Sequence, residues 1–203
     1  MPDRFGSFEG LSEHFEEGRD FEISSVEVKG GRVAILAPHG GKIEKGTSEI
    51  AIRVAQKDYS LYLFEGKMAT DNRDLHVTSH RFFEKRGDAL LAHCEFALGI
   101  HGRADRHDPN TLYLGGRDAE LVELLRSHLL TAGFGAITQG HPFPAQERTN
   151  ICNRCTSGGG AQIELPLTLR LRLLNDGAEM NCLVGAIRGA LCARLIGEPD
   201  NLS

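Results

Sequence analysis

The most informative segment of the chain is Ala34-Ile35-Leu36-Ala37-Pro38-His39-Gly40-Gly41-Lys42-Ile43-Glu44. Together with Val33, its first residues form an apolar run rich in β-branched side chains, which predicts a buried strand over 33–37. The strand is expected to end at Pro38, and a glycine-containing loop then presents His39 and Glu44. A hydroxyl at Thr47 and an acid at Glu49 indicate that a helix begins near residue 47.

The residues after this strand have the chemistry of half a zinc site. Imidazole nitrogen and carboxylate oxygen are ligands of hydrolytic zinc, which takes three protein ligands and keeps one position open. His39 and Glu44 would supply two of them. The alternative interpretation is an ordinary strand-to-helix loop with a surface histidine and a surface glutamate.

A second apolar run, from Phe96 to Ile100, also leads into a His-Gly pair at His101. Strand ends that meet at one edge of an α/β sheet are where ligands gather in such folds, so His101 is predicted as the third metal ligand. Other histidines remain alternative ligands, although each is more simply interpreted as a surface or packed side chain: His76, His80, His107 and His141.

Composition limits the class of protein. A chain of 203 residues, 40% hydrophobic and 25% charged, is long enough to bury a substantial core, and we expect a single domain over 1–203. The net charge of −5 gives no basic footprint, so nucleic acid is not an expected partner, although arginines can still gather around an anionic substrate. The sequence shows no signal peptide and no apolar run of membrane-spanning length. We therefore expect a cytoplasmic monomer that has no membrane partner and could be released by lysis.

The chain contains five cysteines, an odd number that is typical of reduced structural thiols in a cytosolic protein. Cys152 and Cys155 form a CxxC pair, but no second pair accompanies them as in a zinc ribbon.

Apolar runs and amphipathic segments alternate along the chain. The expected strands cover residues 21–28, 32–37, 60–65, 96–102, 111–114, 135–139 and 161–165, and the expected helices cover 7–18, 47–57, 81–92, 117–132 and 179–196. This alternation predicts a three-layer α/β/α fold with a mixed, mostly parallel sheet covered on both faces.

Polar residues in this framework suggest a reaction. Glu164 lies in an apolar strand, where partial burial would raise the pKa of its carboxyl group and suit it to proton transfer. The alternative is an edge-strand glutamate that points to solvent. Two arginines could hold an anionic group or a developing oxyanion: Arg73, which follows Asn72, and Arg154, which follows Asn153 and lies near Asn150.

The ordered motifs of the chain resemble those of the poly-γ-glutamate hydrolase family of phages and bacilli, also described as phage-related replication proteins. The resemblance covers about residues 7–196. In chain order the motifs are Ala37-Pro38-His39-Gly40-Gly41-Lys42-Ile43-Glu44, Gly46-Thr47-Ser48-Glu49-Ile50, Tyr62-Leu63-Phe64-Glu65-Gly66, Asn72-Arg73-Asp74-Leu75-His76-Val77-Thr78-Ser79, Ile100-His101-Gly102, Gly115-Gly116-Arg117-Asp118, Asn150-Ile151-Cys152-Asn153-Arg154 and Gln162-Ile163-Glu164-Leu165.

That resemblance implies a zinc-dependent enzyme with a fold similar to the carboxypeptidase A type of zinc peptidase. It implies His39, Glu44 and His101 as Zn²⁺ ligands and Glu164 as the general base. Carboxypeptidases space their first two ligands as HxxE, whereas four residues separate His39 from Glu44. The fine active-site geometry of carboxypeptidases therefore does not transfer to this chain. The replication name has no support in the residues, which include no nucleotide-binding loop.

We therefore expect a zinc-dependent hydrolase that cleaves γ-glutamyl amide bonds of an anionic polymer or acidic peptide. Glu164 and Arg154 are the expected catalytic residues, and the expected substrate-binding residues are Asn72, Arg73, His76, Asn150 and Asn153. Two alternatives remain open: a zinc amidohydrolase or deacylase for another acidic peptide or acyl amino acid, and a non-catalytic phage-derived binding protein.

Overall fold

The structure, a computed structural model, describes residues 3–197. Within this range, seven strands form one sheet in the order β1-β3-β2-β4-β7-β5-β6. The strands are β1 (Phe21–Val26), β2 (Val33–Gly41), β3 (Ser60–Gly66), β4 (Phe96–Arg103), β5 (Thr111–Gly116), β6 (Gly135–Ile137) and β7 (Ala161–Pro166). Strands β3, β2, β4 and β7 run parallel, whereas β1 and β5 pair antiparallel with β3 and β7. The predicted mixed, mostly parallel sheet is confirmed.

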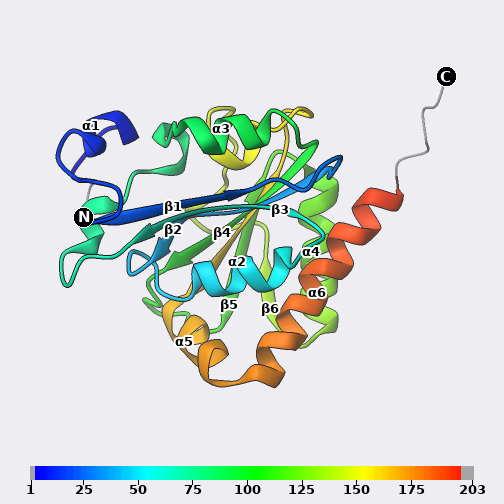
Figure 1. Cartoon of the computed structure of the whole chain (residues 1–203). Helices are drawn as coiled ribbons and strands as arrows, with labels where there is room; N and C mark the ends of the chain where they lie inside the picture. The colour runs from blue at the N-terminus through cyan, green and yellow to red at the C-terminus, as the bar shows by residue number, and fades with distance from the viewer. Residues whose placement is uncertain (1–2, 198–203) are drawn as a thin grey trace.

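Helices cover both faces of the sheet (Figure 1). One face carries α2 (Thr47–Ala55), α4 (Ala119–Thr131), α5 (Leu167–Asn175) and α6 (Gly177–Ile196), and the other carries α1 (Phe8–Ser12) and α3 (Lys85–Leu91). The short 3₁₀ segments η1 (Asn72–Leu75), η2 (Ser79–Arg81) and η3 (Ile151–Asn153) contribute buried residues on the side of α1 and α3. The predicted α/β/α layering is therefore confirmed.

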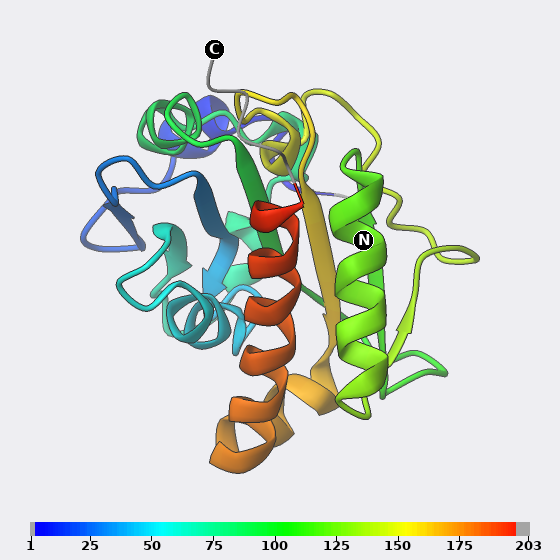
Figure 2. The ribbon, with the colours of Figure 1, turned by 90° about the vertical axis from the view of Figure 1, so that its right-hand side faces the viewer.

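Local sequence explains the helices. In α4, Leu121, Leu125 and Leu129 recur every four residues and are fully buried, while the carboxylate of Asp118 accepts the amide hydrogen of Leu121 as an N-cap. Helix α6 lies beside α4 and shares its core (Figure 2).

Alternation along the strands assigns each side chain to a layer. Ile35 and Ala37 face the core beneath α2 and α6, whereas Ala34 and Leu36 face the core beneath α1 and α3. The same alternation in β7 sends Ile163 toward the first core and Glu164 toward the other face.

The chain order creates a crevice between β2 and β4. From β2 the chain passes to β3 on one side, and from β3 it returns to β4 on the other side. Ligands of open α/β sheets bind at the carboxyl ends of strands where the order reverses in this way. His39, near the end of β2, and His101, near the end of β4, border this point.

The predicted end of one strand is wrong, and one helix is missing from the prediction. Strand β2 continues past Pro38 to Gly41 because Pro38 costs no ladder bond: pairing with β4 stops at Leu36, and the register against β3 shifts between Ala37 and Gly40. Helix α5 was not expected at all.

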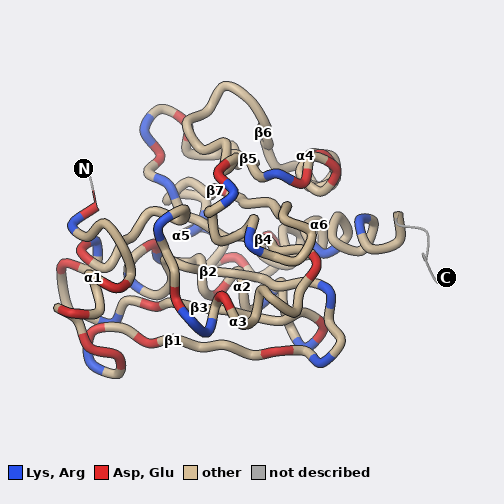
Figure 3. Tube along the Cα trace, turned by 90° about the horizontal axis from the view of Figure 1, so that it is seen from above, with Lys and Arg blue, Asp and Glu red and all other residues tan. Residues whose placement is uncertain are grey.

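Charged residues of both signs are interspersed along the trace, with no long run of one sign (Figure 3). Within residues 3–197, no helix combines the length and apolarity needed to cross a bilayer.

Packing in β4 gives a stability prediction. Leu98 is completely buried beneath the layer of α2 and α6, so Leu98→Ala should lower the free energy of unfolding by about 2–5 kcal/mol through lost burial and a new cavity. Leu130→Ala, at a side chain that is 45% exposed, should change it by less than about 1 kcal/mol. Urea titrations followed by circular dichroism measure the free energy of unfolding of both variants. Equal losses in the two variants would contradict the difference in burial between Leu98 and Leu130.

Candidate metal centre

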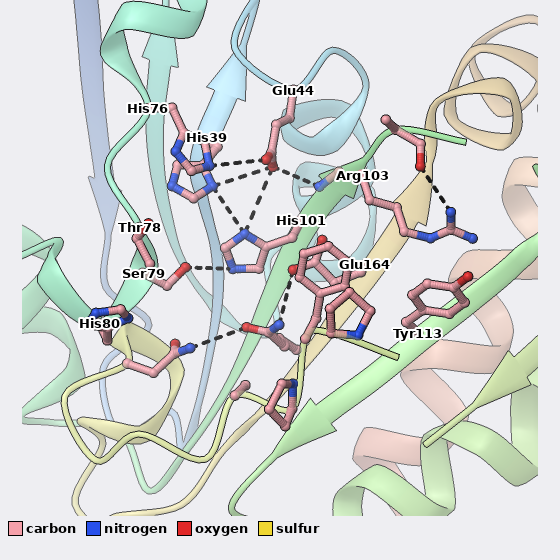
Figure 4. Close-up of a pocket in the computed structure, with 18 of the residues that line it drawn as sticks. His39, Glu44, His76, Thr78, Ser79, His80, His101, Arg103, Tyr113 and Glu164 are labelled. Atoms are coloured by element: carbon pink, nitrogen blue, oxygen red, sulfur yellow. Dashed lines mark hydrogen bonds and ion pairs between the residues drawn. The ribbon is translucent and has the colours of Figure 1, made fainter. Parts of the chain in front are cut away.

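Three side chains predicted as metal ligands meet in one place (Figure 4). Nδ1 of His39 lies 3.2 Å from Nδ1 of His101 and 3.5 Å from Oε2 of Glu44. Nδ1 of His101 lies 3.9 Å from the same carboxylate oxygen. Two nitrogens and one oxygen thus point toward a common position, as the ligands of a single metal ion do. The residues can therefore hold a metal.

Each of the three candidate ligands makes a further contact that helps to orient it. Nε2 of His39 lies 2.8 Å from the carbonyl oxygen of Val77, which can only accept, so Nε2 carries the proton and Nδ1 keeps its lone pair. Nε2 of His101 contacts the hydroxyl of Ser79 at 3.4 Å. The amide of Gly102 donates to Oε2 of Glu44 at 2.7 Å.

The turn between the first two ligands depends on its glycines. Gly41 has φ +61°, and a Cβ there would lie 2.7 Å from the carbonyl oxygen of Gly66. The amide of Glu44 then closes the turn by donating to the carbonyl of His39 at 2.9 Å. The hydroxyl of Thr47, the first residue of α2, donates to the carbonyl of Glu44 at 2.9 Å. This loop therefore has little freedom in where it puts Glu44.

A further layer supports the ligands. The ring of His76 stacks on that of His39, with centroids 3.9 Å apart, and its Nε2 lies 3.6 Å from Oε1 of Glu44. The carboxylate of Asp3 accepts a hydrogen bond from Nδ1 of His76 at 2.7 Å and from the amide of Thr78 at 2.7 Å. A residue at the start of the described chain thus fixes the histidine that faces Glu44.

Burial and mutual charge set the protonation of the ligands. Burial lowers the pKa of His101 to about 3, helped by the charge of His39, so His101 is neutral at pH 7. Burial opposes ionisation of Glu44, but the charges and hydrogen bonds of His39, His76 and His101 together outweigh it, and the pKa of Glu44 falls well below its usual value. Burial would likewise lower the pKa of His39, yet the carboxylate of Glu44 raises it. The anionic carboxylate of Glu44 and the neutral imidazole of His101 are the forms that bind a cation.

Glu164 lies next to this centre. It pairs in register with His101 across the parallel strands β4 and β7, so the two side chains project from the same face. Its Oε1 accepts a hydrogen bond from Nε2 of Gln162 at 3.1 Å, and Oε1 of Gln162 accepts from Nδ2 of Asn150 at 3.3 Å. Burial, and then the negative charge of Glu44, raise the pKa of Glu164 well above its usual value. Glu164 is 7% exposed, so the alternative of an edge-strand glutamate that points to solvent is wrong.

The centre opens into a cavity of about 940 Å³. Of the residues predicted to bind substrate, Arg73, His76 and Asn150 line it. Arg73 also pairs with Asp3 at 3.5 Å. The opposite wall comes from the loops that follow β4 and β6 and from Tyr113 of β5, whose ring centroid lies 3.8 Å from the guanidinium carbon of Arg103.

Three other predicted site residues, Asn72, Asn153 and Arg154, do not line this cavity. The guanidinium of Arg154 bonds to the carbonyl of Phe82 at 2.6 Å and pairs with Asp88 at 3.0 Å. The amide of Asn72 donates to the carbonyl of Met68, and that of Asn153 donates to the carbonyl of Ala145. Each of the three donates to a backbone carbonyl of another segment and so helps to hold loops together.

The sequence did not identify several supporting residues. Asp3, Ser79 and Arg103 reach the site from loops and strands whose approach cannot be deduced from local patterns. Gln162 could have been found, because a polar residue two positions before Glu164 shares its face of the strand.

Comparisons with known proteins show which sequences and structures this chain resembles. Residues 5–181 match the sequence profile of the family described as poly-gamma-glutamate hydrolase. The Bacillus subtilis (strain 168) protein YmaC is 32% identical over 94% of this chain and 85% of its own length. YndL of the same strain is 37% identical over 84% of this chain and 67% of its own length.

Solved structures extend the likeness to three dimensions. A bacteriophage poly-gamma-glutamate hydrolase superposes with a TM-score of 0.92 at 31% identity, over 97% of this chain and 100% of its own. The apo, zinc-free form of YndL superposes with a TM-score of 0.87 at 30% identity, over 95% of this chain and 99% of its own. An N-formylglutamate amidohydrolase from Ralstonia eutropha shares only the fold, with a TM-score of 0.58 at 13% identity over 87% of this chain and 99% of its own. By its profile match and its relatives, the chain belongs to the poly-γ-glutamate hydrolase family.

Proposed function

We propose that this protein is a zinc-dependent hydrolase of γ-glutamyl amide bonds. The observation that supports this most directly is the convergence of His39, Glu44 and His101 beside the buried carboxyl group of Glu164. Membership of the family supports the reaction class, and the zinc-free form of the similar protein YndL supports zinc as the metal.

The donor set suits zinc in a hydrolytic site. Two imidazoles and one carboxylate are a common catalytic ligand set, and this set leaves a coordination position open toward solvent. His39, Glu44 and His101 would hold the ion, and all three line the cavity. Bound zinc would supply a Lewis acid that polarises the scissile carbonyl and the attacking water.

Glu164 would serve as the proton carrier. A carboxyl group whose pKa is raised by burial and by the charge of Glu44 can accept a proton from water and return it to the leaving nitrogen. Gln162 fixes the rotamer of this carboxyl group through the bond to Oε1, and Asn150 fixes Gln162. These residues thus aim the base at the mouth of the cavity.

The substrate would be an anionic chain. Each unit of a γ-linked glutamyl polymer keeps a free α-carboxylate, and an arginine on the cavity wall offers a planar, charged partner for such a group. Arg73 has this position. We assign His76 to orienting Glu44 rather than to holding substrate, because both of its ring nitrogens face carboxylates.

One paired experiment tests the proposal. Metal content of the purified protein should be about one zinc per chain, as expected for a single three-ligand site. Poly-γ-glutamate should shorten on incubation with the protein, stop shortening with a chelator and resume with added zinc. Bound zinc without shortening would redirect the search to other acidic peptides or acyl amino acids, or to a binding role. A zinc-free wild-type protein that still shortens the polymer would overturn the metal proposal.

Replacing the base should separate binding from turnover. Glu164→Gln should keep zinc and lower kcat by about 10²–10⁴-fold, because general-base catalysis acts in the transition state. Zinc analysis and initial rates on the same preparation measure this, with the exposed Glu13→Gln as a control. Turnover equal to wild type would place the base elsewhere.

The same substitution should stabilise the metal-free protein. Because the folded-state pKa of Glu164 is raised, the unfolded chain releases this proton at lower pH, and wild-type stability falls as pH rises above the ordinary glutamate value of about 4.3. Glutamine carries no such proton. In chelator, the unfolding midpoint of Glu164→Gln in urea should therefore exceed that of wild type at pH 7, and the gap should close near pH 4. A gap that widened on acidification would contradict the raised pKa.

A further inference from the structure

Arg170 is a buried cation with no role in the reaction described above. It lies in α5 and is only 4% exposed. Removing a guanidinium from water is costly unless its donors are satisfied, and this side chain has five donors in a rigid fork. Its burial therefore requires acceptors for those donors.

The guanidinium donates to three backbone carbonyls. Nε donates to Leu165 at 3.1 Å, Nη2 donates to Arg103 at 3.3 Å, and Nη1 donates to Lys45. These carbonyls belong to the strand ends and the loop that carry the site.

Each of the three acceptors lies within two residues of a functional side chain. Lys45 directly follows Glu44, Leu165 directly follows Glu164, and Arg103 follows His101 by two positions. One planar group therefore connects two metal ligands and the base through their backbones.

Contact with Gly102 makes the arrangement tight. A Cβ at Gly102 would lie 2.4 Å from Cζ of Arg170 and 2.7 Å from its Nε, so only glycine leaves room for the guanidinium. The amide of Gly102 also donates to Glu44, which places the guanidinium against the residue that orients this ligand.

Electrostatics agree with this position. Burial lowers the pKa of Arg170, and the carboxylates of Glu44 and then Glu164 oppose that change. A positive charge behind two buried carboxylates offsets part of the repulsion between them.

We propose that Arg170 is a positioning residue that sets the spacing of Glu44, His101 and Glu164, and thereby the affinity of the site for zinc. The inference rests on the proposed zinc function. Removing the guanidinium would free three carbonyls and let the strand ends separate, which weakens the convergence of donor atoms.

Zinc affinity of the full chain tests this, measured by competition with a chromophoric chelator. Arg170→Met, which keeps the bulk of the side chain but removes its donors, should weaken zinc binding about 10–100-fold, as losses of supporting groups do in metal sites. Arg170→Lys keeps the positive charge but lacks the planar set of donors. Its zinc affinity should lie between that of Arg170→Met and that of wild type. The visible spectrum of the cobalt-loaded protein should also change, since it reports ligand geometry.

Arg188→Met is the matched control. This arginine also donates to a backbone carbonyl, that of Val54 at 2.7 Å, and pairs with Asp58 near the end of α2 that lies away from Glu44. The zinc affinity of Arg188→Met should equal that of wild type even if the melting temperature of the variant falls. Arg170→Met with a lowered melting temperature but wild-type zinc affinity and cobalt spectrum would overturn the proposal.

A second variant, Gly102→Ala, covers the case in which Arg170→Met does not fold. Gly102→Ala leaves Arg170 in place but forces its guanidinium to shift, so it alone should weaken zinc binding. Where both single variants fold, the double variant should lose less zinc affinity than the two single losses added together, because both substitutions disturb the same contact. Wild-type zinc affinity in Gly102→Ala would refute the role, as would full additivity. A wild-type protein that binds no zinc would instead refute the proposed function.

Discussion

Register between the parallel strands β2, β4 and β7 is the constraint on which the candidate site depends. Their carboxyl ends meet at one edge of the sheet, and a shift of one residue in any strand would send its side chains to the opposite face. His101 and Glu164 face the same layer only because they pair across β4 and β7. The position of His39 depends in addition on the irregularity in β2 after Ala37, which changes the direction of its last residues.

Much of this arrangement could be predicted from the sequence because it follows from short patterns. The apolar runs that end in His-Gly at His39 and His101 identify two strand ends, and family resemblance links them to Glu44 and Glu164. Helix α5 was missed because its buried face contains Arg170 between Leu169 and Leu173, so the segment lacks a continuous apolar stripe. A buried arginine breaks the pattern that identifies helices, and its reason for being buried lies in distant loops.

The position of Arg154 outside the cavity could not be predicted from local sequence either. An arginine beside two asparagines looks equally suited to binding substrate and to holding loops together, since both uses require several donors. Only the fold decides, and here the donors of Arg154 reach the carbonyl of Phe82 and the carboxylate of Asp88. Conversely, Asp3 carries no local signal, yet it bonds to His76 across 73 positions of sequence.

The sequence separation of the site's contacts has a consequence for how the protein folds. His39 and His101 are 62 positions apart, and Arg170 reaches Lys45 across 125. Closing such long loops costs entropy before any contact forms. We therefore expect the candidate metal centre to assemble late in folding, when the sheet is already in register. A metal ion that binds here would stabilise the finished fold by mass action without helping the chain to reach it. The opposite holds in small zinc domains, where the ion drives folding from the start.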